Sequence, residues 1–284
     1  MQNNQYITTT AGVKVPFLIY GTAWKKERTA DLVEQAVLAG FRGIDTACQP
    51  KHYNEFLVGE ALDRVRAQGV DRENLYLQTK FTPIDGQDPE RIPYDENAPL
   101  EVQVAQSFEV SLKNLRTEYV DTLILHSPLA THDLTMKAWR AMEEIHEAGG
   151  VRQLGISNCY YIDVVKKLYA DARVKPAILQ NRFYGDTGYD VALRRWCAEE
   201  GILYQSFWTL TANPHILDSE TVQSLAGKYG KSEAQIFFRC LNQWGMVPLT
   251  GTCSGQHMRE DLHILEFELS ADELEKMGGL LNIK

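Results

Sequence analysis

The hydrophobic pattern of the chain alternates between two kinds of segment. Short apolar runs are separated by longer stretches in which apolar residues recur every three or four positions. This alternation predicts βαβ units, in which amphipathic helices cover a parallel sheet. Eight runs qualify as strands, and they span residues 15–21, 43–46, 75–80, 122–126, 151–157, 177–181, 202–207 and 246–249.

The spacing of the strands predicts how the sheet closes. Their ends recur about every 33 residues, the length of one βαβ unit, and intervening helices are predicted at residues 27–38, 54–67 and 102–115. A last helix is expected at residues 272–280. Eight such units predict an α/β fold, a (β/α)8 TIM barrel that occupies residues 1–284 as a single domain. Residues 81–99, with four prolines, and residues 208–217 lack a period and predict loops.

Composition narrows the function classes. With 44% hydrophobic residues, the chain can bury a full core. Its 29 basic and 38 acidic residues give a net charge of −9, which disfavours nucleic acid and anionic membranes as partners. No apolar run reaches about 18 residues and the first residues lack signal-peptide features, so we expect a cytoplasmic protein. No surface stripe suggests an interface, so we expect a monomer or weak homo-oligomer.

Polar residues close several of the apolar runs. Because the active site of such a barrel lies at the C-terminal ends of the strands, these residues are the candidates for chemistry. Asp45 alone also suits a turn, and His126 alone also suits a hydrogen-bonded core position. A buried Asp45 and Lys80 that face each other would keep one another ionised and lower the pKa of a neighbouring hydroxyl.

Five motifs resemble the aldo-keto reductase family. They are G-F-R-G-I-D-T-A from Gly40, N-E-x-x-V-G-E-A-L from Asn54, T-K-F from Thr79, D-T-L-I-L-H-S-P from Asp121 and L-G-I-S-N from Leu154. The motifs occur in order, and the match extends from the first strand to the last helices. The resemblance implies a reductase that passes a hydride from a nicotinamide cofactor to a carbonyl carbon, while a tyrosine protonates the oxygen. It implies no metal.

The resemblance also implies roles for individual side chains. Tyr53 would be the proton donor, with Lys80 and Asp45 stabilising its phenolate and His126 orienting the carbonyl. The spacing departs from the family, because eight residues instead of five separate Asp45 from Tyr53, and alignment from the N-E-x-x-V-G side puts His52 in the place of the tyrosine. If His52 is the acid, the pH optimum should fall, since imidazole titrates near pH ~6.5. Otherwise His52 is a second pocket residue, carried by the loop. Trp24 resembles the family's substrate-facing tryptophan.

Cofactor contacts follow from the same resemblance. It implies that Ser157, Asn158 and Gln180 hold the nicotinamide carboxamide and that Phe207 stacks on the ring. V-P-L-T-G-T-C-S replaces the family's V-P-K-S, so Leu249 stands where a lysine usually meets the 2'-phosphate. The candidates at the adenosine end are Thr250, Gly251, Thr252, His257, Glu260 and Asp261. We expect NADPH, with NADH as the alternative because that lysine is missing.

Substrate choice is expected to depend on three segments: the 81–99 loop with Tyr94, the His52 loop, and the stretch that begins at Trp208. Their bulky side chains suit a medium-sized or bulky hydrophobic carbonyl compound. The sequence does not continue into the C-terminal loop of many family members, so a more open site is expected. Two alternatives use the same barrel. One is a non-redox secondary-metabolite enzyme, with Tyr53 or His52 as proton shuttle. The other is a nucleotide-sensing regulatory subunit, against which the intact Asp45, Lys80 and His126 argue.

Overall fold

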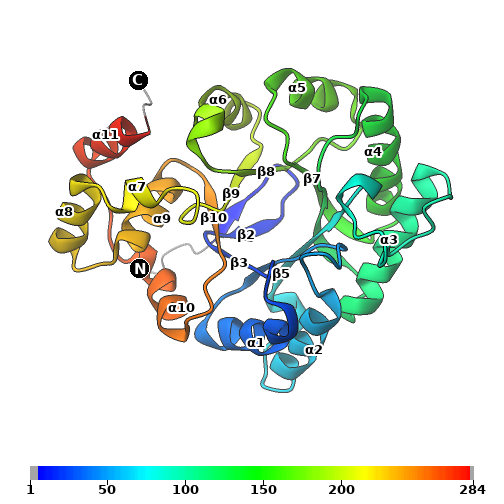
Figure 1. Ribbon diagram of the computed structural model, residues 1–284, viewed down its shortest axis with the longest axis horizontal. Helices are drawn as coiled ribbons and strands as arrows, with labels where there is room; N and C mark the ends of the chain where they lie inside the picture. The colour runs from blue at the N-terminus through cyan, green and yellow to red at the C-terminus, as the bar shows by residue number, and fades with distance from the viewer. Residues whose placement is uncertain (1–5, 282–284) are drawn as a thin grey trace.

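A closed barrel of eight parallel strands forms the centre of the molecule (Figure 1). The computed structural model describes residues 6–281. The strands are, in order around the barrel, β10 (Val247–Thr250), β3 (Ile19–Gly21), β4 (Gly43–Asp45), β5 (Tyr76–Phe81), β6 (Val120–Leu125), β7 (Val151–Ser157), β8 (Ile178–Arg182) and β9 (Leu203–Phe207). Since β10 pairs with both β9 and β3, the barrel itself is closed. The predicted (β/α)8 barrel is confirmed.

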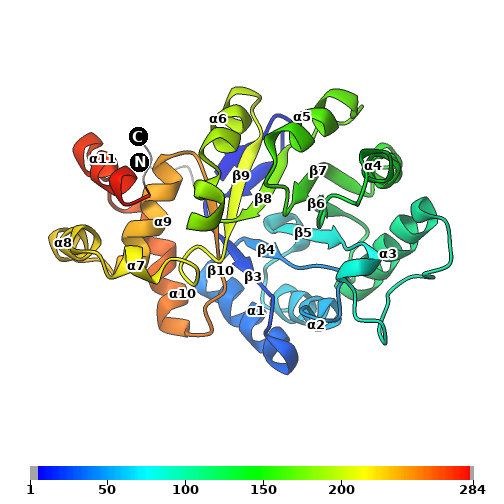
Figure 2. The same ribbon diagram turned by 45° about the horizontal axis from the view of Figure 1, so that its top comes forward.

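Helices surround the strands, as both ribbon views show (Figures 1 and 2). They are α1 (Thr29–Ala39), α2 (Glu55–Arg66), α3 (Leu100–Leu115), α4 (His132–Glu147), α5 (Ile162–Asp171), α6 (Val191–Glu199), α7 (Pro214–Leu217), α8 (Glu220–Tyr229), α9 (Glu233–Gln243), α10 (Gly255–Asp261) and α11 (Ala271–Leu280). Their starts follow local hydrogen bonding: the Ser232 and Ser270 hydroxyls, for example, cap α9 and α11. Among the helices of residues 6–281, none has the length and apolar character needed to cross a membrane.

The prediction of one continuous first strand at residues 15–21 was wrong. The chain leaves extended pairing after Pro16, so β2 (Lys14–Pro16) pairs antiparallel with β1 (Tyr6–Thr8) and only β3 joins the barrel. Pro16 lacks an N–H for a ladder on both sides, which favours an edge position. Val13 and Val15 pack into the barrel interior, and Figure 1 shows β2 at the centre of the ring of helices. The hairpin therefore closes the N-terminal end of the barrel.

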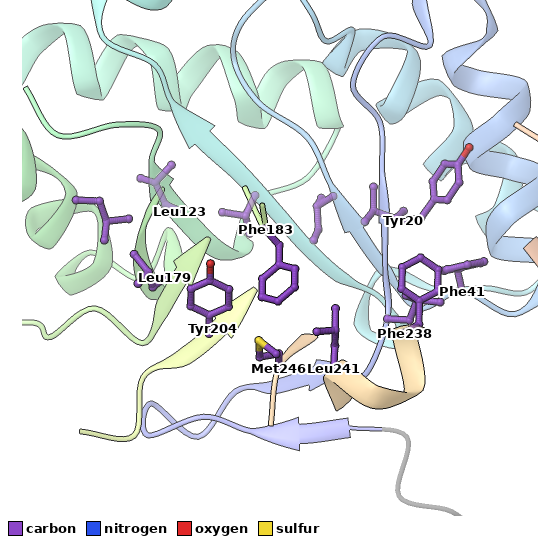
Figure 3. Packing of buried hydrophobic residues seen from close by; sticks show 14 of the residues in the cluster. Tyr20, Phe41, Leu123, Leu179, Phe183, Tyr204, Phe238, Leu241 and Met246 are labelled. Carbon is purple, nitrogen blue, oxygen red and sulfur yellow. The ribbon is translucent and has the colours of Figure 1, made fainter. Parts of the chain in front are cut away.

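Two apolar clusters hold the barrel. The larger fills the space between strands and helices, where Leu179, Phe183 and Tyr204 lie near Met246 and Leu241 (Figure 3). The smaller fills the barrel interior and includes Ile19, Tyr76, Ile124, Ile178 and Val247. Buried polar side chains also lie inside the barrel, and among them Gln78 and Gln205 lie next to Asp45 at the end of β4.

The two predicted loops differ from expectation in detail. The segment after β5 has only one short turn of 3-10 helix, Ile84–Gly86, before α3. Within it Tyr94 is buried, packs 5.7 Å from the Phe81 ring and donates a 2.9 Å hydrogen bond to the Thr82 carbonyl. Tyr94 therefore anchors the loop, and its expected part in substrate choice is not supported. Residues 208–217 include the short helix α7, which begins at Pro214, a residue suited to a first helical position.

Candidate active site

A buried ion pair lies at the C-terminal ends of two adjacent strands. Asp45 ends β4, and Lys80 is the last residue but one of β5. The Lys80 Nζ lies 2.7 Å from each carboxylate oxygen of Asp45 and 2.8 Å from the Thr46 carbonyl. Burial lowers the pKa of Lys80, whose exposure is 1%, while the negative charge of Asp45 acts in the opposite direction. The structure thus brings together the two side chains expected to face each other.

Tyr53 lies beside this pair. The Lys80 Nζ is 5.0 Å from the centre of the Tyr53 ring, and the His126 ring centre is 6.1 Å from it. Burial raises the pKa of the Tyr53 hydroxyl, and the charge of Asp45 raises it further. The hydroxyl consequently keeps its proton at neutral pH and has a cation close to it. A phenol in these surroundings can donate a proton.

The loop before Tyr53 explains how the longer spacing is accommodated. The backbone N–H groups of His52 and Tyr53 both donate to the Gln49 carbonyl, at 3.2 and 3.0 Å. The Gln49 amide donates to the Gly86 carbonyl at 2.8 Å, and the Gln87 amide donates to the Cys48 carbonyl at 3.0 Å. These bonds fold the extra residues into a tight turn and attach it to the segment after β5. Tyr53 therefore reaches Lys80 from eight residues beyond Asp45.

His52 lies elsewhere, against Trp24. The two ring centres are 4.0 Å apart, and the backbone N–H of Trp24 donates to the His52 carbonyl at 2.7 Å. Trp24 is 57% exposed. Burial lowers the pKa of His52, and the nearby Lys51 lowers it further. The two candidate acids are thus separated: Tyr53 lies at the ion pair, whereas His52 and Trp24 form an aromatic wall.

His126 follows β6 and is held from several sides. Its Nδ1 is 2.6 Å from the Thr82 hydroxyl, its backbone N–H donates to the Phe81 carbonyl, and its carbonyl accepts a 2.9 Å hydrogen bond from Asn158. Burial lowers the pKa of His126 well below its usual value, and the charge of Lys80 adds to the effect. The imidazole is therefore neutral at neutral pH, with Nε2 left for a ligand. Thr82 was missed in the sequence, although it directly follows the T-K-F motif.

The expected carboxamide contacts come from adjacent strands. Ser157 ends β7, and Asn158 follows it in a left-handed conformation with φ of 50°. Gln180 of β8 uses its Nε2 within the barrel, where it donates to Asp45 Oδ1 and to Gln205, each at 3.0 Å. Its Oε1 is the atom left for a cofactor. Phe207 at the end of β9 is partly buried and packs on the interior cluster.

The segment after β10 carries the candidates for the adenosine end. The Thr250 hydroxyl donates to the Asp261 carboxylate at 2.8 Å, and both residues are buried. Burial raises the pKa of Asp261 to about 6. These two side chains therefore bind each other and join the two ends of the segment. Gly251 and His257 are exposed, and Thr252 and Glu260 are partly exposed.

Lys25 supplies a cation that sequence reasoning missed. It is buried, its Nζ donates to the Gly251 carbonyl, and the same atom lies 3.5 Å from Cys253 Sγ. Leu249, by contrast, is buried in the barrel interior. The cation at this segment thus comes from the loop after β3. The signal was the basic residue directly after Trp24.

Trp208 lies away from Trp24 and lines a pocket of its own. It is 45% exposed and its ring lies 4.2 Å from the Arg182 guanidinium. Together with Tyr184 and His215 these residues line a pocket of about 690 Å³. Trp208 follows β9 and Trp24 follows β3, with β10 between these strands. The two tryptophans therefore follow strands that are not neighbours in the barrel.

The closed (β/α)8 barrel is blocked at one end. Its other end carries a Lys–Asp pair, a tyrosine and a neutral histidine. These features define a barrel enzyme with its site at the C-terminal ends of the strands. The model of the aldo/keto reductase family matches residues 18–203, and the chain belongs to that family. Membership places it among oxidoreductases of carbonyl compounds.

Relatives match over nearly the whole chain. A glyoxal reductase of Bacillus subtilis is 29% identical over 272 residues, covering 95% of this chain and 90% of the relative. An NADPH-dependent alpha-keto amide reductase of Saccharomyces cerevisiae is 28% identical, covering 98% and 91%. The crystal structure of an aldo/keto reductase from Brucella melitensis superposes with a TM-score of 0.81 at 27% identity, covering 97% of this chain and 98% of that one.

Proposed function

We propose that this protein reduces aldehydes or ketones to alcohols with NADPH, and that Tyr53 donates the proton. The observation that carries the proposal is the placement of Tyr53 between a buried ammonium and a neutral imidazole. Lys80 lies 5.0 Å from the Tyr53 ring centre, and His126 lies 6.1 Å from it. His52 contacts Trp24 instead.

Each of the four residues has a distinct task. Tyr53 Oη gives its proton to the carbonyl oxygen of the substrate and becomes a phenolate. A phenol with a pKa of about 10 is a poor acid unless a cation stabilises its anion, and Lys80 supplies that charge. Asp45 holds Lys80 in place. His126 donates a hydrogen bond from Nε2 to the carbonyl oxygen, which polarises the carbonyl while the neutral ring keeps its proton.

The site fits a nicotinamide cofactor. Phe207 offers a partly buried ring face, and Ser157, Asn158 and the Gln180 Oε1 offer polar atoms at neighbouring strand ends. Lys25 is a buried cation, and no ion pair joins it to a carboxylate among residues 6–281, so it suits a phosphate. When bound, the cofactor supplies the hydride that reduces the carbonyl carbon.

Replacing Lys25 by methionine is expected to raise the KM for NADPH about tenfold, because a charged hydrogen bond contributes about 1.5–3 kcal/mol. The KM for NADH should rise less, since NADH lacks the 2'-phosphate. Steady-state kinetics with both cofactors measures this. Lys26→Met removes an exposed charge beside it and is expected to leave both constants unchanged. An equal rise for both cofactors would place Lys25 at a group that they share.

For the substrate we propose a carbonyl activated by a neighbouring carbonyl and attached to an apolar group. The two relatives named for glyoxal and for alpha-keto amides support the activated carbonyl. The stacked rings of Trp24 and His52 support the apolar group, because they offer an exposed aromatic wall. Phenylglyoxal combines both features.

The test is NADPH oxidation by the purified protein with phenylglyoxal, methylglyoxal and glyceraldehyde, followed by mass analysis of the products. We expect fastest turnover with phenylglyoxal and a product heavier by two hydrogens. Turnover of glyceraldehyde alone would contradict the substrate class. A product of unchanged mass would support the non-redox alternative, and NADPH binding without turnover would support the regulatory one.

A further inference from the structure

Three glutamines form a buried layer directly below the ion pair. Gln78 of β5, Gln180 of β8 and Gln205 of β9 are 0–2% exposed. The strand register places Gln78 beside Asp45 and Gln180 beside Gln205. Burying a primary amide is unfavourable unless its hydrogen bonds are made. Gln78 and Gln205 have no task in the chemistry proposed above, so their burial needs another explanation.

The hydrogen bonds of this layer converge on Asp45. Gln78 Nε2 donates to Asp45 Oδ1 at 2.6 Å and to Gln205 Oε1 at 2.9 Å. Gln180 Nε2 donates to the same two atoms, each at 3.0 Å. Gln205 Nε2 donates back to Gln78 Oε1 at 3.1 Å. A carboxylate only accepts hydrogen bonds, so the network orients both neighbouring amides with their N–H groups towards Asp45.

The layer is also fixed from below. The Tyr76 hydroxyl donates to Gln78 Oε1 at 2.7 Å and lies 2.6 Å from the Thr122 hydroxyl. Gln153 donates to Thr122 at 2.9 Å and accepts a hydrogen bond from Thr9, beside the hairpin that closes the barrel. The hydrogen bonds therefore run from the closed end of the barrel to Asp45. A network with both ends fixed allows the Gln78 amide few other orientations.

Asp45 receives its donors unequally. Its Oδ1 accepts from Gln78, Gln180 and Lys80, whereas its Oδ2 accepts from Lys80. We propose that Gln78 is a positioning residue for the proposed reaction: its amide holds the Asp45 carboxylate in its orientation, and thereby holds the Lys80 ammonium beside Tyr53. This inference rests on the proposed function for its kinetic consequences, but its structural content concerns Asp45 and Lys80 alone.

Loss of the Gln78 amide is expected to shift the pKa values of Lys80 and Tyr53 in a defined direction. The negative charge of Asp45 raises the pKa of both Lys80 and Tyr53. The Gln78 amide donor partly offsets that charge, so without it Lys80 and Tyr53 should both lose their protons at higher pH. The other titratable groups that face the pair are Glu55 of α2 and His126 after β6. Gln78 hydrogen-bonds to neither of them, so their effect is common to the wild type and the variant.

The kinetic test compares Gln78→Met with Gln153→Met. Both substitutions remove a buried amide from the same network, but Gln153 is hydrogen-bonded to Thr122 and Thr9 and not to Asp45. For Gln78→Met we expect kcat to fall about tenfold, because small displacements of catalytic groups are costly. The alkaline limb of its kcat–pH profile should move up by about one pH unit. Gln153→Met should lose comparable thermal stability and keep the wild-type profile, because the Tyr76 hydroxyl still donates to Gln78 Oε1.

A second readout does not need turnover. In protein labelled with [ε-¹³C]lysine, the Lys80 signal, assigned with Lys80→Met, is titrated by NMR. Its midpoint is expected at higher pH in Gln78→Met and unchanged in Gln153→Met. If Gln78→Met does not fold, Gln205→Met, which removes the amide that orients Gln78, is expected to shift the midpoint in the same direction. An inactive wild type would refute the proposed reaction and leave this readout intact. A Lys80 midpoint that is equal in wild type and variants would overturn the positioning role.

Discussion

Tyr53→Phe is expected to lower kcat about 10³-fold, within the range usual for loss of a general acid, and to leave NADPH affinity nearly unchanged. The phenyl ring keeps the packing beside Lys80 and His126 but has no proton to give. Water would have to protonate the carbonyl oxygen instead. Single-turnover kinetics with phenylglyoxal, together with NADPH titration by fluorescence, separates the two quantities.

His52→Phe is the matched control for this prediction. It removes the imidazole but keeps an aromatic ring against Trp24, which lies 4.0 Å from His52 in the structure. We expect a change of a few-fold in KM and little change in kcat, since His52 belongs to the aromatic wall. If His52→Phe lost turnover while Tyr53→Phe kept it, the acid would be His52, as the alternative alignment requires.

Lys80→Met is expected to have a comparable effect on turnover and a large effect on stability. Without the ammonium, the Tyr53 phenolate has no adjacent cation, so kcat should fall at least 10²-fold. Among residues 6–281, Lys80 is the only cation that donates a hydrogen bond to the buried Asp45, and the variant removes it. Breaking a buried pair from one side typically costs about 3–5 kcal/mol in the free energy of unfolding. Urea unfolding measures this loss.

The double variant Asp45→Asn with Lys80→Met tests the cause of that instability. It removes both charges, so the unfolding free energy should recover by about 2 kcal/mol or more relative to Lys80→Met, because no unpaired charge is left buried. Turnover should stay lost. Strictly additive losses of stability in the double variant would show that the pair is not coupled.

The fold was largely predictable because its signal is local and repeated. Strand β7 matches its predicted bounds, residues 151–157, since an apolar run follows Gly149 and Gly150 and ends in polar residues. The division of the first predicted strand into β2 and β3 was not predictable. An apolar run reports burial but not which strand it pairs with, so residues 15–21 were merged although Pro16 marks the boundary between hairpin and barrel.

The candidate site was partly predictable for a geometric reason. The ends of parallel strands meet at one end of a barrel, so Asp45 and Lys80 could be placed together from their positions in the sequence. Side chains on loops could not be placed in this way. The turn that brings Tyr53 to Lys80 depends on hydrogen bonds to Gly86 and from Gln87, more than 30 residues away.

The glutamine layer was invisible in the sequence for a different reason. A glutamine in a strand suggests a solvent-facing position, because barrel interiors are usually filled by branched apolar side chains. Only the register of the closed barrel brings Gln78 and Gln205 together below Asp45. The chemistry of this site therefore depends on residues that no single motif contains.

The most direct test of the proposed carbonyl reduction uses NADPH deuterated at both C4 positions, with phenylglyoxal as substrate and mass spectrometry of the product. The account predicts an alcohol that carries one deuterium on the former carbonyl carbon and one hydroxyl proton that exchanges with water. A product without deuterium, or one with the mass of the substrate, would contradict it.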